Sequence, residues 1–184
     1  QSAQPEQVSG MQQDVQEMES LIDEMLSYAR LEIAGEQLSR EEFDLSELMQ
    51  AQLDKLRGLS SKEITTSIES DIKVNANAHY LARVIQNLLQ NADKYGASQI
   101  DVSLTEVEQQ VIIVVEDDGE GIAEDQYESV FMPFVRLEKS RNKHLGGYGL
   151  GLAIVKKIVS GHKGQCVVAK SKLGGASFVI TLPK

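Results

Sequence analysis

The first 35 residues carry a regular stripe of apolar positions, separated alternately by three and four residues. Polar residues fill nearly all other positions, so the pattern predicts one long amphipathic helix that ends at Gly35. Such a helix cannot bury its stripe alone and needs another helix of the chain, or its own copy in a dimer. Packing on the following domain is the alternative, because methionine-rich stripes also occur in cores. The stripe consists of Val8, Met11, Val15, Met18, Ile22, Met25 and Ala29.

Beyond Gly35 the spacing of apolar residues changes between helical and extended periods. Helical spacing predicts helices over 43–56, 78–95 and 152–159, the first of them capped by Asp44 or Ser46. Alternating apolar residues predict strands over 63–68, 99–107, 110–116, 165–170 and 176–182, and the strands over 99–107 and 110–116 are close enough for a hairpin. Helices and strands are grouped in runs along the chain more than they alternate. The expected fold class is therefore α+β, a mixed sheet covered on one face by helices.

The stretch from Gly119 to Gly151 is long, polar and rich in glycine, apart from a short apolar group at 130–135. A connection of this length favours a functional loop or lid. We expect its residues 123–145 to be mobile without ligand, since they hold few apolar anchors beyond Phe131 and Phe134.

Composition narrows the possible functions. The chain has 184 residues, of which 41% are hydrophobic, enough for one main domain with a small appendage. A net charge of −10 without a strong basic cluster argues against nucleic-acid binding. Cys166 is the only cysteine, so we expect an inert thiol in a reducing compartment. Because no run of about 18 apolar residues occurs, the segment is expected to be soluble, and its first residue, Gln1, suggests a piece of something longer or a processed product.

The helix predicted over 78–95 carries a polar stripe beside its apolar face. Asn87, Asn91 and Lys94 follow one another at helical spacing, although asparagine is a mediocre helix former. An amide oxygen can bind a hard cation such as Mg²⁺ while phosphates supply the negative charge, and a lysine one turn further on can meet a phosphate. The alternative is a solvated polar stripe.

An acidic segment follows directly on the strand predicted over 110–116. Asp117 precedes Gly119 and Gly121 at a spacing that suits recognition of a donor group, such as the exocyclic amine of adenine, while the glycine backbone approaches the ligand. A plain Asp-Gly turn is the alternative. The neighbouring Glu116 and Asp118 are expected to face solvent.

A second glycine-rich segment leads directly into the helix predicted over 152–159. Its backbone N–H groups can converge on phosphate oxygens, and the start of the helix adds partial positive charge. The segment is neither a Walker loop nor a convincing dinucleotide fingerprint, because no Gly-Lys-Ser/Thr follows it and no buried strand leads into it. It reads Gly146-Gly147-Tyr148-Gly149-Leu150-Gly151-Leu152.

These elements, taken in order, resemble the sequence boxes of sensor histidine kinases. The segment from Arg83 to Tyr95 looks like the N box and the segment from Asp117 to Gly121 like the DxGxG box. Residues 131–134 resemble the F box, 147–152 the GxGLGL box and 174–178 the closing glycine motif. Together they cover the chain from about residue 43 to residue 183.

The resemblance implies the Bergerat ATP-binding fold, with ATP and Mg²⁺ as cofactors. Asn91 is then the Mg²⁺ ligand, and Asp117 binds adenine. Lys94 and Tyr95 face the phosphates or the ribose, and Arg136 reaches the γ-phosphate from the lid. The remaining residues implied to contact the nucleotide are Asn87, Gly119, Gly121, Ile122, Gly147, Tyr148, Gly149, Leu150 and Gly151.

The residue at position 87 distinguishes histidine kinases from the chaperone, gyrase and mismatch-repair ATPases that share the Bergerat fold. By resemblance, the ATP-hydrolysing relatives have at this position a glutamate that activates water, whereas the amide of Asn87 has no useful basicity near neutral pH. Asn87 therefore favours delivery of the phosphoryl group to an external acceptor, with Lys94 and Arg136 neutralising charge. An ATPase of the chaperone or topoisomerase type is one alternative. A nucleotide-sensing module without phosphotransfer is the other.

Residues 21–32 resemble the second helix of the family's dimerisation and phosphoacceptor hairpin. The implied division is residues 1–35 for that helix and 36–184 for the catalytic domain. The helix that bears the phosphoacceptor histidine is not in this sequence, and none of His79, His144 and His162 replaces it. By resemblance, the intact protein is a homodimer joined through the N-terminal helix and a partner of a response regulator receiver domain. The chain is then the cytoplasmic part of a bacterial inner-membrane sensor, anchored by segments outside this sequence.

Overall fold

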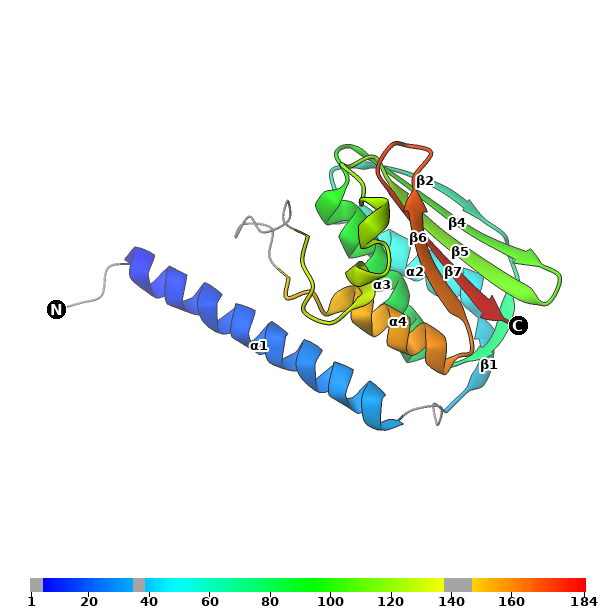
Figure 1. Ribbon diagram of the computed structural model, residues 1–184, viewed down its shortest axis with the longest axis horizontal. Helices are drawn as coiled ribbons and strands as arrows, with labels where there is room; N and C mark the ends of the chain where they lie inside the picture. Colours follow the sequence, from blue (N-terminus) through cyan, green and yellow to red (C-terminus); the bar gives the residue numbers. More distant parts are fainter. Residues whose placement is uncertain (1–4, 35–38, 138–146) are drawn as a thin grey trace.

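The computed structural model describes the chain except for residues 1–4, 35–38 and 138–146 (Figure 1). The main sheet has five strands in the order β2-β4-β5-β7-β6. Strand β2 (Glu63–Ile68) pairs in parallel with β4 (Gln99–Val107), and all other pairs are antiparallel. β4 and β5 (Gln110–Asp117) form the predicted hairpin, and β6 (Gln165–Lys170) and β7 (Ala176–Pro183) complete the sheet. The strand predictions are confirmed, with β5 and β7 each one residue longer.

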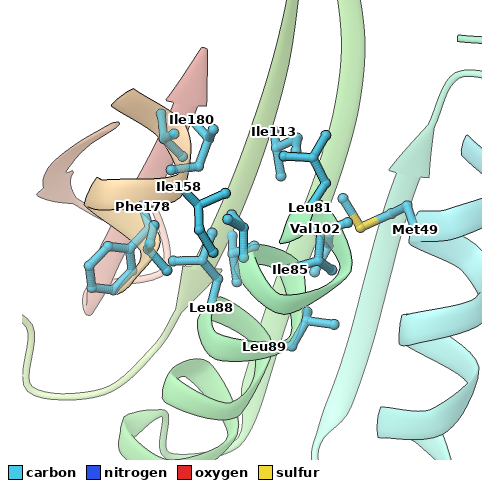
Figure 2. Close-up of a cluster of buried hydrophobic side chains, with 14 of the residues drawn as sticks. Met49, Leu81, Ile85, Leu88, Leu89, Val102, Ile113, Ile158, Phe178 and Ile180 are labelled. Atoms are coloured by element: carbon cyan, nitrogen blue, oxygen red, sulfur yellow. The ribbon is translucent and has the colours of Figure 1, made fainter. Parts of the chain in front are cut away.

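Three helices cover one face of this sheet: α2 (Leu45–Arg57), α3 (Ala78–Tyr95) and α4 (Gly151–Gly161). Helix α3 buries its predicted apolar face, and Figure 2 shows Leu81, Ile85 and Leu88 between the sheet and the neighbouring helices. On the strands, alternate residues such as Val102 and Ile113 supply the opposite side of the core. The α+β fold class is confirmed.

A small second sheet was not predicted. β1 (Glu41–Asp44) pairs antiparallel with β3 (Lys73–Ala76), so Phe43 lies in a strand and not in the helix predicted over 43–56. Helix α2 begins at Leu45, and the Asp44 carboxylate accepts hydrogen bonds from the backbone N–H groups of Ser46 and Glu47 at 2.8 and 3.2 Å. Asp44, not Ser46, is therefore the cap. Strands of four residues are too short to show a period in the sequence.

Helix α1 (Pro5–Ala34) confirms the predicted N-terminal helix, and its two faces have different surroundings. One face packs on α4, where Leu31 is buried and Glu32 pairs with Lys157 at 3.2 Å. On the other, Val15 and Met18 of the predicted stripe are 53% and 62% exposed. Packing on the domain therefore does not bury the part of the stripe whose surroundings the structure describes. Val8, Met11 and Gly35 lie outside the residues whose surroundings are described. Among the helices in the described part of the chain, none combines the length and the hydrophobicity that a membrane span requires.

We expect Leu88→Ala to lower the free energy of unfolding by about 2–5 kcal/mol, because the leucine is fully buried and truncation leaves a cavity. Leu59→Ala is the matched control, since Leu59 is 88% exposed and its loss should cost less than about 0.5 kcal/mol. Urea denaturation followed by circular dichroism measures both values. Equal losses in the two variants would contradict this description of the core.

Candidate functional site

A cavity of about 1000 Å³ opens between α3, the end of β5, the segment after β5 and the start of α4. Most of the residues proposed from the sequence line it together, although they are spread from position 87 to position 151 of the chain. Gly119 and Leu150 are not among the lining residues, and Leu150 is fully buried in the core. The lining residues that the sequence suggested are Asn87, Asn91, Lys94, Tyr95, Asp117, Gly121, Ile122, Arg136, Gly147, Tyr148, Gly149 and Gly151.

The polar stripe of α3 faces this cavity and not open solvent. Asn87, Asn91 and Lys94 all line it, and the Lys94 ammonium lies 4.8 Å from the centre of the Tyr95 ring. The Asn87 side-chain nitrogen Nδ2 is buried and has no hydrogen-bond partner among the described residues. A buried polar group without a partner is costly, and it is common where a ligand completes the hydrogen bonding.

Asp117 ends β5 at the base of the cavity and is only 3% exposed. Its Oδ1 accepts hydrogen bonds from the backbone N–H groups of Gly119 at 2.9 Å and Ala176 at 3.2 Å, while its carbonyl oxygen accepts from Gly175 at 3.2 Å. No described residue donates to Oδ2, which remains available to a ligand. Burial raises the pKa of the Asp117 carboxyl, and the hydrogen bonds from Gly119 and Ala176 oppose that effect only in part.

Two glycines leave room for this arrangement. A Cβ atom at Gly119 would collide with the carbonyl oxygen of Tyr95, and one at Gly175 would collide with Oδ1 of Asp117. The sequence interpretation linked Gly119 to the ligand itself, but in the structure the N–H of this glycine donates to Oδ1 of Asp117 and holds the carboxylate in place. Gly175 lies in the closing glycine motif of the sequence, which carried no site assignment there.

The glycine-rich segment before α4 closes the opposite side of the cavity. Gly147 and Gly149 have left-handed backbone conformations, with φ of 95° and 75°, which residues other than glycine rarely adopt. A Cβ atom at Gly147 would lie 3.0 Å from Nζ of Lys94, and one at Gly149 would lie 2.7 Å from the carbonyl oxygen of Val135. The described part of this loop therefore meets both α3 and the lid.

The lid is described only up to residue 137, so part of the range predicted to be mobile lies outside the described residues. Two short 3₁₀ helices, η1 (Glu124–Gln126) and η2 (Ser129–Phe131), begin it. Phe131 is buried and meets the Phe178 ring edge-on at 6.3 Å, as expected of an anchor. Phe134 is 59% exposed, so the expectation that it anchors the lid is wrong. Mobility of the lid stays a prediction.

Of the two acidic neighbours of Asp117, Glu116 does not face solvent as expected, whereas Asp118 is partly exposed. Glu116 is only 8% exposed and forms an ion pair with Lys172. Asp118 accepts a hydrogen bond from the Ser98 hydroxyl at 2.6 Å, and this bond is the main reason why its pKa lies well below the usual range. The backbone N–H groups of Ser98 and Ala97, at 2.9 and 2.8 Å, lower the pKa further. Asp118 thereby ties the end of α3 to the end of β5. The prediction for Glu116 failed because its partner Lys172 lies 56 positions away in sequence.

Sequence reasoning also missed Glu24 of α1, which lines the cavity. Burial raises the pKa of its carboxyl, and the positive charges of Arg83 and Lys94 work in the opposite direction. No local pattern in α1 marks this residue, because its role depends on how the helix packs on the domain.

His162 belongs to the fold and not to the site. It is 3% exposed, its Nε2 accepts the backbone N–H of Asn77 at 3.0 Å, and its Nδ1 lies 2.8 Å from the carbonyl oxygen of Ile158. This residue joins the end of α4 to the start of α3, where Asn77 is the N-cap. Lys163 follows with φ of 60°, a left-handed backbone conformation that is uncommon for residues other than glycine.

Fold and cavity together define an α+β nucleotide-binding domain. Residues 76–184 match the family described as histidine kinase-, DNA gyrase B-, and HSP90-like ATPases. The chain belongs to this family and contains the catalytic ATP-binding domain of a sensor histidine kinase.

Individual relatives agree with this assignment. Sensor protein RstB of Escherichia coli (strain K12) is 37% identical over 180 residues, which cover 94% of this chain and 40% of RstB. The solved mycobacterial sensor histidine kinase MprB aligns with a TM-score of 0.69 at 28% identity, over 78% of this chain and 97% of its own. Full-length ShkA in complex with AMPPNP aligns with a TM-score of 0.82 at 25% identity, over 100% of this chain and 39% of its own. The chain thus spans less than half of RstB.

We expect the Asp117 carboxyl to titrate above the usual aspartate value of about 3.9, because burial disfavours its charged form. A raised pKa in the folded state means that the stability contributed by Asp117 is present at low pH and is lost as pH rises through the raised value. Carbon-13 NMR of labelled aspartate side chains measures the titration, with Asp117→Asn identifying the signal. A midpoint at or below the usual value would contradict the stated effect of burial.

Proposed function

We propose that this chain is the catalytic part of a sensor histidine kinase that binds ATP with Mg²⁺ and transfers the γ-phosphoryl group to a histidine outside this sequence. A response regulator would then receive the phosphoryl group. The observation that carries the proposal is the Asp117 carboxylate, whose Oδ1 is held by two backbone N–H groups while Oδ2 is left for a ligand at the base of the cavity.

Adenine would bind at this end of the cavity. Its exocyclic amine donates a hydrogen bond, and an ionised carboxylate oxygen in a buried site is a strong acceptor. Ile122 and Phe178, which line the same cavity, offer apolar surface to the base. This end would therefore select the nucleobase.

Mg²⁺ and the phosphates would bind toward α3 and the glycine-rich loop. Asn91 supplies an amide oxygen, and the described residues include no group of three or more His, Cys, Asp or Glu side chains that could hold a metal alone. This poor donor set fits Mg²⁺, which is commonly bound through one or two protein ligands together with phosphates and water. When bound, Mg²⁺ would neutralise charge on the transferred phosphoryl group.

The residues of this chain would then orient the triphosphate. Lys94 and the N–H groups around Gly147 and Gly149 supply positive charge and donors, and Arg136 approaches from the lid. Asn87 supplies an amide where hydrolysis needs a base, so it would leave the phosphoryl group to a histidine acceptor. We therefore propose Asn87, Lys94 and Arg136 as the catalytic residues of the transfer.

The N-terminal helix would serve dimerisation. We assign residues 1–35 to the second helix of the dimerisation hairpin and 36–184 to the catalytic domain. An apolar surface on α1, which partner helices could cover in a homodimer, supports this assignment. It is formed by the exposed side chains of Val15, Met18, Ile22 and Met25. We place the chain on the cytoplasmic side of a bacterial inner membrane, anchored by segments outside this sequence. The relatives matched are named sensor proteins, which supports this location.

Phosphotransfer can be tested directly. The chain is incubated with radiolabelled ATP, Mg²⁺ and a separate protein that carries the phosphoacceptor helix of a related hairpin. We expect label on the histidine of that helix and none on this chain incubated alone. Intact nucleotide binding without transfer to any such helix would contradict the kinase proposal and favour a nucleotide-sensing module.

We expect Asp117→Asn to weaken ATP binding by about 10- to 100-fold, equivalent to about 1.5–3 kcal/mol for a hydrogen bond to a charged group. The amide Oδ1 can still accept from Gly119 and Ala176, so the fold should survive, but the amide nitrogen would oppose the adenine amine. Asp125→Asn is the matched control because Asp125 is exposed and does not line the cavity. Isothermal titration calorimetry measures both affinities, and equal affinities would refute adenine binding at Asp117.

ATP binding by the wild-type chain should also weaken as pH falls through the raised pKa of Asp117, since only the ionised carboxylate accepts from adenine on Oδ2. Calorimetric titrations from neutral pH down to the most acidic pH at which the chain stays folded measure this dependence. Affinity that stays constant over that range, or rises with acid, would contradict the assigned protonation state.

We expect Glu24→Gln to tighten ATP binding about two- to five-fold, because the Glu24 carboxylate lies in the cavity near Arg83 and Lys94 and would repel a triphosphate. Glu19→Gln is the control, since it makes the same charge change at an exposed position of α1. Competition with a fluorescent ATP analogue measures both. Equal affinity of the Glu24 and Glu19 variants would rule out this repulsion.

A further inference from the structure

The last two residues of β5 point to opposite faces of the sheet and bind the same turn, formed by residues 171–175 between β6 and β7 (Figure 1). Asp117, on the helix side, accepts from the N–H groups of Gly175 and Ala176. Glu116, on the other side, accepts from the backbone N–H of Lys172 at 3.2 Å and pairs with its Nζ at 3.1 Å. The turn is therefore held from both faces of one strand.

Lys172 resolves an electrostatic conflict on the outer face. Glu116 lies directly opposite Asp101 in the pairing of β4 with β5, and two carboxylates in that position repel each other. Nζ of Lys172 lies 2.5 Å from Oδ2 of Asp101 and 3.1 Å from Oε2 of Glu116. These hydrogen bonds, the one with Asp101 first, raise the pKa of Lys172. The lysine thus neutralises both carboxylates at once.

The turn itself transmits this contact to Asp117. The N–H of Ser171 donates to the carbonyl oxygen of Gly175 at 2.9 Å, the N–H of Leu173 donates to the Ser171 hydroxyl at 2.9 Å, and the N–H of Gly174 donates to the Ser171 carbonyl oxygen at 3.1 Å. With so many internal hydrogen bonds, a displacement at Lys172 moves the Gly175 and Ala176 N–H groups with it. The Gly175 N–H donates to the main-chain carbonyl oxygen of Asp117, and the Ala176 N–H donates to Oδ1 of its carboxylate, so both groups help to set the orientation of that side chain.

We propose that Lys172 and Glu116 are positioning residues for base recognition: by fixing this turn they orient the Asp117 carboxylate and so set the preference for a purine with a 6-amino group. The proposal rests on the proposed binding of adenine at Asp117. Neither residue lines the cavity, and neither would touch the nucleotide. Their effect should appear only where the amine of the base is read.

The test compares ATP with purine riboside triphosphate, which lacks the 6-amino group, by calorimetry on the wild-type chain and on variants. Wild type should bind ATP about ten-fold or more tightly than the analogue. Lys172→Met should lower ATP affinity about 3- to 10-fold and leave analogue affinity unchanged, so the ratio of the two affinities shrinks. Glu116→Gln should shrink the ratio less, because its amide oxygen can still accept the Lys172 N–H.

Lys172→Arg should keep the wild-type ratio, since it preserves the positive charge between Asp101 and Glu116. Lys170→Met is the matched control for loss of a nearby exposed positive charge, and it should also keep the ratio. A Lys172→Met variant with the wild-type ratio, or with equal losses for both nucleotides, would overturn the proposal. If Lys172→Met does not fold, an unchanged ratio in Glu116→Gln overturns it instead. Wild type without any preference for ATP would instead contradict the adenine site itself.

Discussion

The site depends on one buried carboxylate whose two oxygens have different tasks. Oδ1 of Asp117 is fixed by one backbone N–H group from the segment that follows β5 and one from the start of β7, while Oδ2 is left for the ligand. Burial makes the charge costly and also makes each hydrogen bond to it stronger. Glycines at 119 and 175 are required because any side chain there would displace the donors or the carboxylate itself. A rigid sheet thus presents one acceptor in one direction.

The second end of the cavity is built on a helix and a loop. Helix α3 buries its apolar face on the sheet, which aims Asn87, Asn91 and Lys94 into the cavity. Asp118 ties the end of this helix to the end of β5, so the two ends of the site have a fixed separation. The glycine-rich loop completes the enclosure. A ligand with a polar base at one end and phosphates at the other matches this distribution of groups.

Features that depend on residues close together in the chain could be predicted from the sequence. The apolar period of α3, the cap at Asp44, and the acid followed by glycines at Asp117 are visible in short windows of sequence. The burial of Glu116 depends on Lys172, which is 56 positions away, and the place of Glu24 in the cavity depends on the packing of α1. The exposure of Phe134 likewise depends on the tertiary position of the lid. Such long-range pairings leave no period or spacing to read.

NMR observation of the backbone amides during an ATP titration tests the central claim most directly. If Asp117 holds adenine through Oδ2, the amide signals of Gly119 and Ala176, which donate to the same carboxylate, should shift in proportion to saturation, while that of Val107, at the opposite end of the β4–β5 hairpin from Asp117, should not. A folded chain whose Gly119 and Ala176 signals stay in place at saturating ATP and Mg²⁺ would contradict the account.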